Sequence, residues 1–167
     1  EYNLRLLCPE ADPAQMNRVI AHFRKYYDAS GWKNSALYEG VLPLLERVKA
    51  DGLVQYIVTN KPKAATCAII DWFHLDSYFE KIICPDIQSP SFLSKKEMLS
   101  WLIETDRIDI NEACYVGDTP SDASAAYQCG LIFGAARYGY GDFSDMAEGC
   151  PPITLERISD LVNRFEL

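Results

Sequence analysis

Two carboxylates stand four residues apart in the segment YVGDTPSDASAAYQCG, which covers residues 115–130. Asp118 directly follows an apolar stretch and a glycine, and Asp122 comes about one helical turn later. One interpretation is a helix start with Thr119 as N-cap, Pro120 at the first position and Asp122 in the first turn, near the positive end of the helix dipole. That interpretation explains Asp122 but not Asp118. The alternative is a cation site, because magnesium takes one or two carboxylates, several waters and a substrate phosphate oxygen.

A second polar cluster, VTNKP, covers residues 58–62 and ends an apolar run with a hydroxyl, an amide and an ammonium group. Pro62 then begins a helical pattern. Two interpretations stay open. Thr59 or Asn60 caps the free backbone N–H groups of the helix, or the helix start and the Thr59 hydroxyl together bind a phosphate.

The third cluster is SKKE, residues 94–97, which matches the S-x-x-E capping box. Two consecutive lysines in a first helical turn lie next to the positive end of the dipole, which costs a few tenths of a kcal/mol. A lysine that faces a site would neutralise phosphate there, and a solvated lysine accounts for the other one. The pattern alone does not choose between Lys95 and Lys96.

The elements that position these clusters alternate along the chain. Short, near-continuous apolar runs are typical of strands buried on both faces, and helical patterns lie between them. The predicted strands are 54–58, 81–84, 113–116 and 131–135, and the predicted helices are 13–29, 41–52, 63–73, 95–104, 120–129 and 155–165. This alternation predicts an α/β fold with a doubly wound, mostly parallel sheet. Ligand sites in such sheets lie at the carboxyl ends of the strands, which directs attention to the residues that follow each strand, namely Thr59, Asn60, Lys61, Asp86, Asp118 and Arg137.

Composition narrows the class of protein. The 167 residues carry a net charge of −8, so neither nucleic acid nor an anionic membrane is an expected partner. No apolar run reaches the roughly 20 residues that span a bilayer, and the first residues lack a signal-peptide pattern. The six cysteines form no C-x-x-C pair, which indicates reduced thiols in a cytoplasmic protein.

Taken in order, the three clusters resemble motifs of the haloacid dehalogenase superfamily of phosphohydrolases. The VTN stretch resembles the second motif, which places Thr59 and Asn60 on the phosphate. The VGDTPSD stretch resembles the fourth motif, G-D-x-x-x-D, which makes Asp118 and Asp122 the magnesium ligands. The resemblance covers nearly the whole chain from about Tyr38 to the end.

Within the same resemblance, SKKE is similar to the third motif in a variant without the usual Lys-x-Pro. Lys96 is then the expected catalytic and phosphate-binding lysine, with Lys95 the second choice. The segment YGYGD, residues 138–142, resembles the stretch after the fifth strand in phosphoglycolate-phosphatase-like members. Residues 1–37 are expected to be the C-terminal part of a helical cap, and residues 38–167 the α/β core. Aromatic residues of the cap and linker face the substrate or serve as structural anchors; these are Tyr26, Tyr27, Trp32 and Tyr38.

The first motif of the family, D-x-D, is missing: no D-x-D occurs in residues 1–167. The resemblance implies a magnesium-dependent phosphatase of small phosphorylated metabolites that forms an aspartyl-phosphate on a nucleophile outside these residues. A central strand would then be missing between 54–58 and 113–116, leaving a gap of roughly 10 Å, about twice the normal strand spacing. On this reading the sequence is part of a longer chain, and the 167 residues alone are inactive. The alternatives are a phosphomutase of the same family and a non-catalytic, truncated or degenerate binding module.

Overall fold

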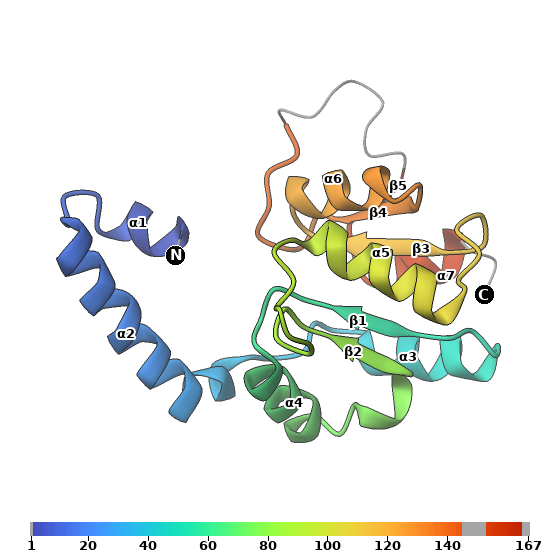
Figure 1. Cartoon of the computed structure of the whole chain (residues 1–167). Helices are drawn as coiled ribbons and strands as arrows, with labels where there is room; N and C mark the ends of the chain where they lie inside the picture. Colours follow the sequence, from blue (N-terminus) through green and yellow to red (C-terminus); the bar gives the residue numbers. More distant parts are fainter. Residues whose placement is uncertain (1, 145–152, 165–167) are drawn as a thin grey trace.

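A helical arm and an α/β body make up the computed structural model (Figure 1), which describes residues 2–144 and 153–164. The arm consists of α1 (Tyr2–Leu7) and α2 (Pro13–Ala29), and the short helix η1 (Gly31–Asn34) joins it to the body. The bounds of α2 confirm the predicted helix. A complete capping box starts it, since Asp12 and Gln15 exchange hydrogen bonds between side chain and backbone.

The body follows the predicted alternation of strands and helices. Its elements are α3 (Val41–Ala50), β1 (Tyr56–Val58), α4 (Lys63–Trp72), η2 (Asp76–Tyr78), β2 (Lys81–Ile83), α5 (Lys95–Asp106), β3 (Cys114–Gly117), α6 (Pro120–Gln128), β4 (Ile132–Ala136), β5 (Ile153–Leu155) and α7 (Asp160–Arg164). One prediction is wrong at the C-terminal end. Leu155 ends strand β5 instead of opening the last helix, which begins at Asp160, while Phe165 lies outside the described residues. Pairing with β4 decides this, because a run of only three residues shows no distinctive period.

The strands form two parallel sheets. One has the order β1-β2 and the other the order β3-β4-β5. The chain thus winds outward in both directions from β1 and β3, and such a reversal marks the usual ligand crevice of an open α/β sheet. The break lies between 54–58 and 113–116, where the family resemblance implies an additional strand.

Helix α5 joins the two halves of the body. Its Leu99 packs with residues of α6 and β4, including Ala126 and Phe133, in one core cluster. Its Met98 and Leu102 pack with Ile83 in another. Figure 1 shows α5 crossing in front of the break between the sheets. The break is therefore bridged by side-chain packing and not by a ladder of backbone hydrogen bonds.

Burial differs among the strands. In β4 every residue except Ile132 is buried, as the pattern predicts, whereas all residues of β1 and β3 are only half-buried. No described strand pairs with the sides of β1 and β3 that face the break, and this explains the difference.

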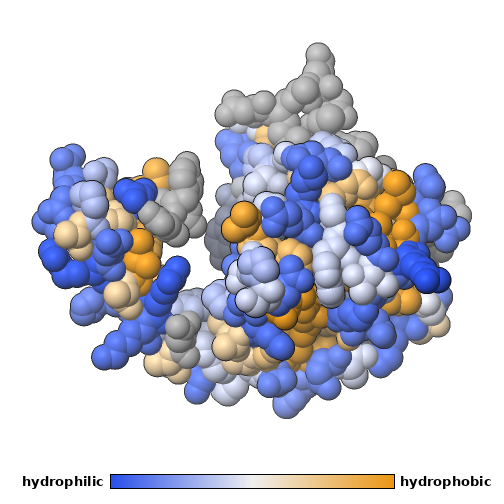
Figure 2. Space-filling model, in the orientation of Figure 1, coloured by the Kyte–Doolittle hydropathy of each residue, from blue (hydrophilic) through white to orange (hydrophobic). Residues whose placement is uncertain are grey.

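Apolar side chains also lie exposed on the arm. Leu6, Leu7, Phe23 and Tyr26 expose between 48% and 77% of their surface, and Figure 2 shows part of this apolar surface on the side of the arm that faces the body.

The cysteines of the described residues are free, and Cys150 lies outside those residues. Within the described ranges no helix is both long enough and apolar enough to cross a membrane.

Candidate functional site

Asp118 lies at the carboxyl end of β3 under the segment 138–142. Its Oδ2 accepts a hydrogen bond from the backbone N–H of Tyr140 at 3.0 Å. Glycines make the close approach possible: a Cβ on Gly139 would lie 2.2 Å from the Cβ of Asp118, and one on Gly141 would lie 1.9 Å from its carbonyl oxygen. The segment that resembles the stretch after the family's fifth strand therefore holds Asp118 in place.

Asp122 is buried and has partners on both carboxylate oxygens. Its Oδ2 accepts from the backbone N–H and the hydroxyl of Thr119, at 3.1 and 2.8 Å, in a capping box at the start of α6. Its Oδ1 pairs with the ammonium group of Lys95, which comes from α5. The helix-capping interpretation of Thr119 and Asp122 is confirmed, and the charge of Asp122 is also balanced by a cation of the chain itself.

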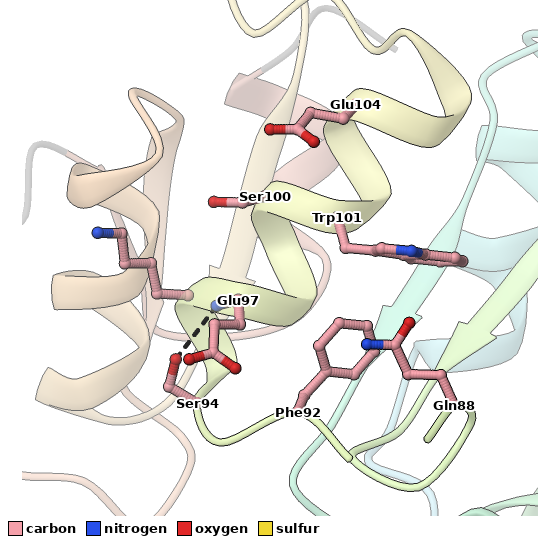
Figure 3. Close-up of a pocket in the computed structure, with 8 residues that line it drawn as sticks. Gln88, Phe92, Ser94, Glu97, Ser100, Trp101 and Glu104 are labelled. Carbon is pink, nitrogen blue, oxygen red and sulfur yellow. Dashed lines mark hydrogen bonds between the residues drawn. The ribbon is translucent and has the colours of Figure 1, made fainter. Parts of the chain in front are cut away.

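The structure separates Lys95 from Lys96. The Lys95 side chain is 17% exposed and points to Asp122. Lys96 is exposed and lines a cavity of about 440 Å³ together with Phe92 and Trp101, whose rings meet edge to face in Figure 3. Consecutive helical residues point about 100° apart, so only one lysine of the pair can face Asp122. In this geometry Lys95, the second choice, faces Asp122, and Lys96, the first choice, does not.

The ends of SKKE cap α5 in a modified way. The Ser94 hydroxyl accepts from the backbone N–H of Glu97 at 3.2 Å. The Glu97 carboxylate, however, accepts from the N–H of Leu93 and not from that of Ser94. Both residues therefore satisfy backbone donors, and Lys95 faces Asp122.

The start of α4 does not follow the capping interpretation, and phosphate binding at this loop stays a prediction. The Thr59 hydroxyl accepts from the backbone N–H of Lys61 at 3.2 Å, and neither Thr59 nor Asn60 caps the helix. Instead Asp86, which follows β2, accepts from the N–H of Lys63 at 2.8 Å. The Thr59 hydroxyl can still donate its own proton, and the exposed Asn60 lines a cavity of about 360 Å³ with Asp86.

Tyr115 connects the two strand ends across the break, and the sequence analysis missed it. Its hydroxyl donates to the carbonyl of Val58, the residue before Thr59, at 3.4 Å. Burial raises the pKa of Tyr115, and the charges of Asp122 and Asp118 raise it further. Its hydroxyl therefore lies at the end of β1, where the charges of both carboxylates act on it. The signal in the sequence was the hydroxyl group of Tyr115, a polar group within an otherwise apolar strand, three residues before Asp118.

Two aromatic residues of the arm and linker lie next to this region. The Lys61 ammonium donates to the hydroxyl of Tyr27 and lies 4.9 Å from the centre of its ring. Tyr38 meets Tyr138 edge to face at 5.0 Å. Burial raises the pKa of Tyr138 to about 12, and the nearby Tyr38 and Asp118 contribute to this shift. Arg137, by contrast, faces Glu156 at 3.8 Å on the surface.

Asp118 is the carboxylate of this site that could coordinate a divalent cation. No group of three or more His, Cys, Asp or Glu residues in the described part of the chain is arranged to hold a metal. Both oxygens of Asp122 have partners within the chain. Asp118 is half-buried, and among the residues that the structure describes only its Oδ2 has a hydrogen-bond partner. Since magnesium keeps several waters and needs only one or two carboxylates, the residues fit a magnesium site with Asp118 as the direct ligand and Asp122 behind it.

Comparison with known proteins identifies the family. The sequence model described as haloacid dehalogenase-like hydrolase matches residues 3–136. The chain belongs to this hydrolase family. Two phosphoglycolate phosphatases resemble this haloacid dehalogenase-like chain, each at 29% identity. That of Photobacterium profundum matches over 96% of this chain and 70% of its own length, and phosphoglycolate phosphatase 1 of Pseudomonas aeruginosa over 86% and 52%.

A solved structure agrees on the fold. The haloacid dehalogenase-like hydrolase from Streptococcus pneumoniae superimposes with a TM-score of 0.84 at 21% identity, over 95% of this chain and 74% of that one. The chain thus spans between about half and three quarters of the length of these relatives.

The close approach of Gly141 to Asp118 predicts that a larger residue at position 141 lowers the stability of the fold. Gly141→Ala places a methyl group against the carbonyl of Asp118, so we expect the segment to shift and the free energy of unfolding to fall by about 1–3 kcal/mol. Urea denaturation measures this. Gly134→Ala is the matched control, because its Cβ would meet neighbours at 3.4 Å or more, an ordinary contact distance. Equal losses in both variants would contradict the proposed packing of Gly141 on Asp118.

Proposed function

We propose that the protein to which this chain belongs is a magnesium-dependent phosphatase of small phosphorylated metabolites, similar to phosphoglycolate phosphatases. Family membership and the names of the relatives support a phosphoester hydrolase. The single observation that carries the proposal is the ion pair of Lys95 with Asp122, four residues after Asp118. From the same strand, the Tyr115 hydroxyl contacts the end of β1, next to Thr59.

Each residue has a role that follows from its position. The Thr59 hydroxyl donates to a phosphoryl oxygen, and Asn60 lines the adjoining cavity. The Lys95 ammonium pairs with Asp122 and offsets negative charge on the phosphoryl group. Asp118 would hold the magnesium ion, which supplies positive charge for the phosphoryl oxygens when it is bound.

The nucleophile in this proposal is an aspartate outside the 167 residues, since these contain no D-x-D. Its carboxylate oxygen forms a bond to phosphorus while the ester P–O bond breaks, and the leaving oxygen takes up a proton. Water then attacks the aspartyl-phosphate and releases inorganic phosphate. The break between β1 and β3, beside both Thr59 and Asp118, is where a strand that carries this aspartate would lie.

A second candidate function is a non-catalytic module that binds phosphorylated ligands. The absence of D-x-D from these residues favours it. The preserved pairing of Lys95 with Asp122 favours the enzyme, because a surface that only binds a partner does not need a neutralised acidic pair at this point.

Measuring phosphatase activity with and without magnesium distinguishes the metal-dependent enzyme from the non-catalytic binding module. We expect the full-length protein to hydrolyse p-nitrophenyl phosphate with magnesium and to lose at least about 100-fold of its kcat in EDTA, because one fixed charge at a reacting centre is worth about that much. Excess magnesium should restore activity. The 167-residue chain alone is the control and should show no turnover. Metal-independent hydrolysis would reject the role of Asp118, and activity in the short chain would show that the nucleophile lies within it.

A further inference from the structure

A cavity of about 360 Å³ lies between helix α2 of the arm and the body. Arg24 lines it from α2, and Asn60 and Asp86 line it from the loops after β1 and β2. Its size is in the range of small-molecule sites. The cavity therefore extends from the proposed phosphate-binding loop to a cation on the arm.

Arg24 has no ionic partner among residues 2–144 and 153–164. Its side chain forms no ion pair or hydrogen bond with any residue of the described ranges, although the protein carries 24 acidic side chains and a net charge of −8. An unpaired guanidinium group is thus presented to a cavity, in a protein where carboxylates outnumber cations.

The position of Arg24 over the cavity is held by its neighbour on the same face of α2. Tyr27 follows three residues later, so it lies on the same side of the helix. Its hydroxyl and ring both contact the Lys61 ammonium, which comes from the loop after β1. This contact ties α2 to the loop that contains Thr59 and Asn60, one helical turn from Arg24.

We propose that Arg24 binds a carboxylate carried by the substrate, and so selects phosphomonoesters with a second anionic group at a short distance from the phosphate. This inference rests on the proposed function. A guanidinium group presents two parallel N–H donors that match a carboxylate, which a lysine does not. Thr59 and Lys95 receive the phosphoryl group at one end, and Arg24 receives the carboxylate at the other.

Asp86 is the one acidic group that lines this cavity. Its Oδ1 accepts from the N–H of Lys63, so its charge lies at the positive end of α4. Its charge is therefore stabilised by α4, and Arg24 keeps its donors for a ligand.

The test compares two esters of the same carbon skeleton, 2-phosphoglycolate and ethyl phosphate, on the full-length protein with magnesium. The measured quantity is the ratio of kcat/KM for the first ester to that for the second. Arg24→Ala should lower this ratio by about 10- to 100-fold, the usual effect of removing one charge-assisted hydrogen-bonding group. Arg24→Lys keeps the charge and should give an intermediate ratio.

Lys25→Ala is the matched control, because it removes an adjacent positive charge from an exposed residue that does not line the cavity. Its ratio should stay within about twofold of the unmodified protein, as for an ordinary surface substitution. A ratio unchanged by Arg24→Ala, or lowered as much by Lys25→Ala, overturns the inference while leaving the phosphatase in place. Hydrolysis of neither ester by the unmodified protein overturns the proposed function and the inference with it.

Discussion

Asp118→Asn should lower the kcat of the full-length protein on p-nitrophenyl phosphate by about 100- to 1,000-fold, because it removes the charge that we propose holds magnesium at the phosphoryl group. An asparagine keeps an oxygen that can accept from the Tyr140 N–H, so the segment above the residue should stay in place. The magnesium concentration needed for half-maximal activity should rise in the same variant. Steady-state kinetics across a magnesium titration measure both effects.

Asp109→Asn serves as the control for this substitution. Asp109 is exposed and precedes β3, at the opposite end of the strand from Asp118, and its side chain caps the N–H of Asn111, a bond that asparagine also makes. Its turnover should match that of the unmodified protein. Full activity of Asp118→Asn at low magnesium would show that the ion is held elsewhere or is not needed.

Lys95→Met should both slow catalysis and weaken the fold. The variant leaves the buried Asp122 without its cation, and loss of one partner of a buried pair costs about 3 kcal/mol. The lost charge should also lower kcat by about 100-fold or more, as expected for a group that stabilises a transferring phosphoryl group. Urea denaturation and steady-state kinetics check the two effects separately.

Lys96→Met is the matched control, since the neighbouring lysine is exposed and lies on another side of α5. It should change stability by less than about 0.5 kcal/mol, as surface substitutions do. In the double variant Lys95→Met with Asp122→Asn, the buried charge is removed, so part of the stability should return without activity. A larger loss of activity for Lys96→Met than for Lys95→Met would restore the first choice made from the sequence.

Local patterns in the sequence were sufficient for most of the elements and for the cap of α6, but not for the cap of α4 or for strand β5. The helix at 13–29, the capping box of Thr119 with Asp122, and the placement of Asp118 after a strand all depend on residues within about four positions of each other. Neighbours of this kind interact whatever the rest of the chain does. The order of the three motifs then indicated the family, which the match to residues 3–136 confirms.

Contacts between distant segments were decided only by the tertiary structure. Two adjacent lysines look alike in sequence, and only the packing of α5 against α6 turns Lys95 toward Asp122. In the same way, Asp86 caps α4 from 23 residues away, and Tyr115 reaches Val58 from 57 residues away. The sequence by itself thus determined which kinds of groups stand at the strand ends. Which of them meet depends on helix rotation and on the approach of separate loops, and no local period encodes either of these.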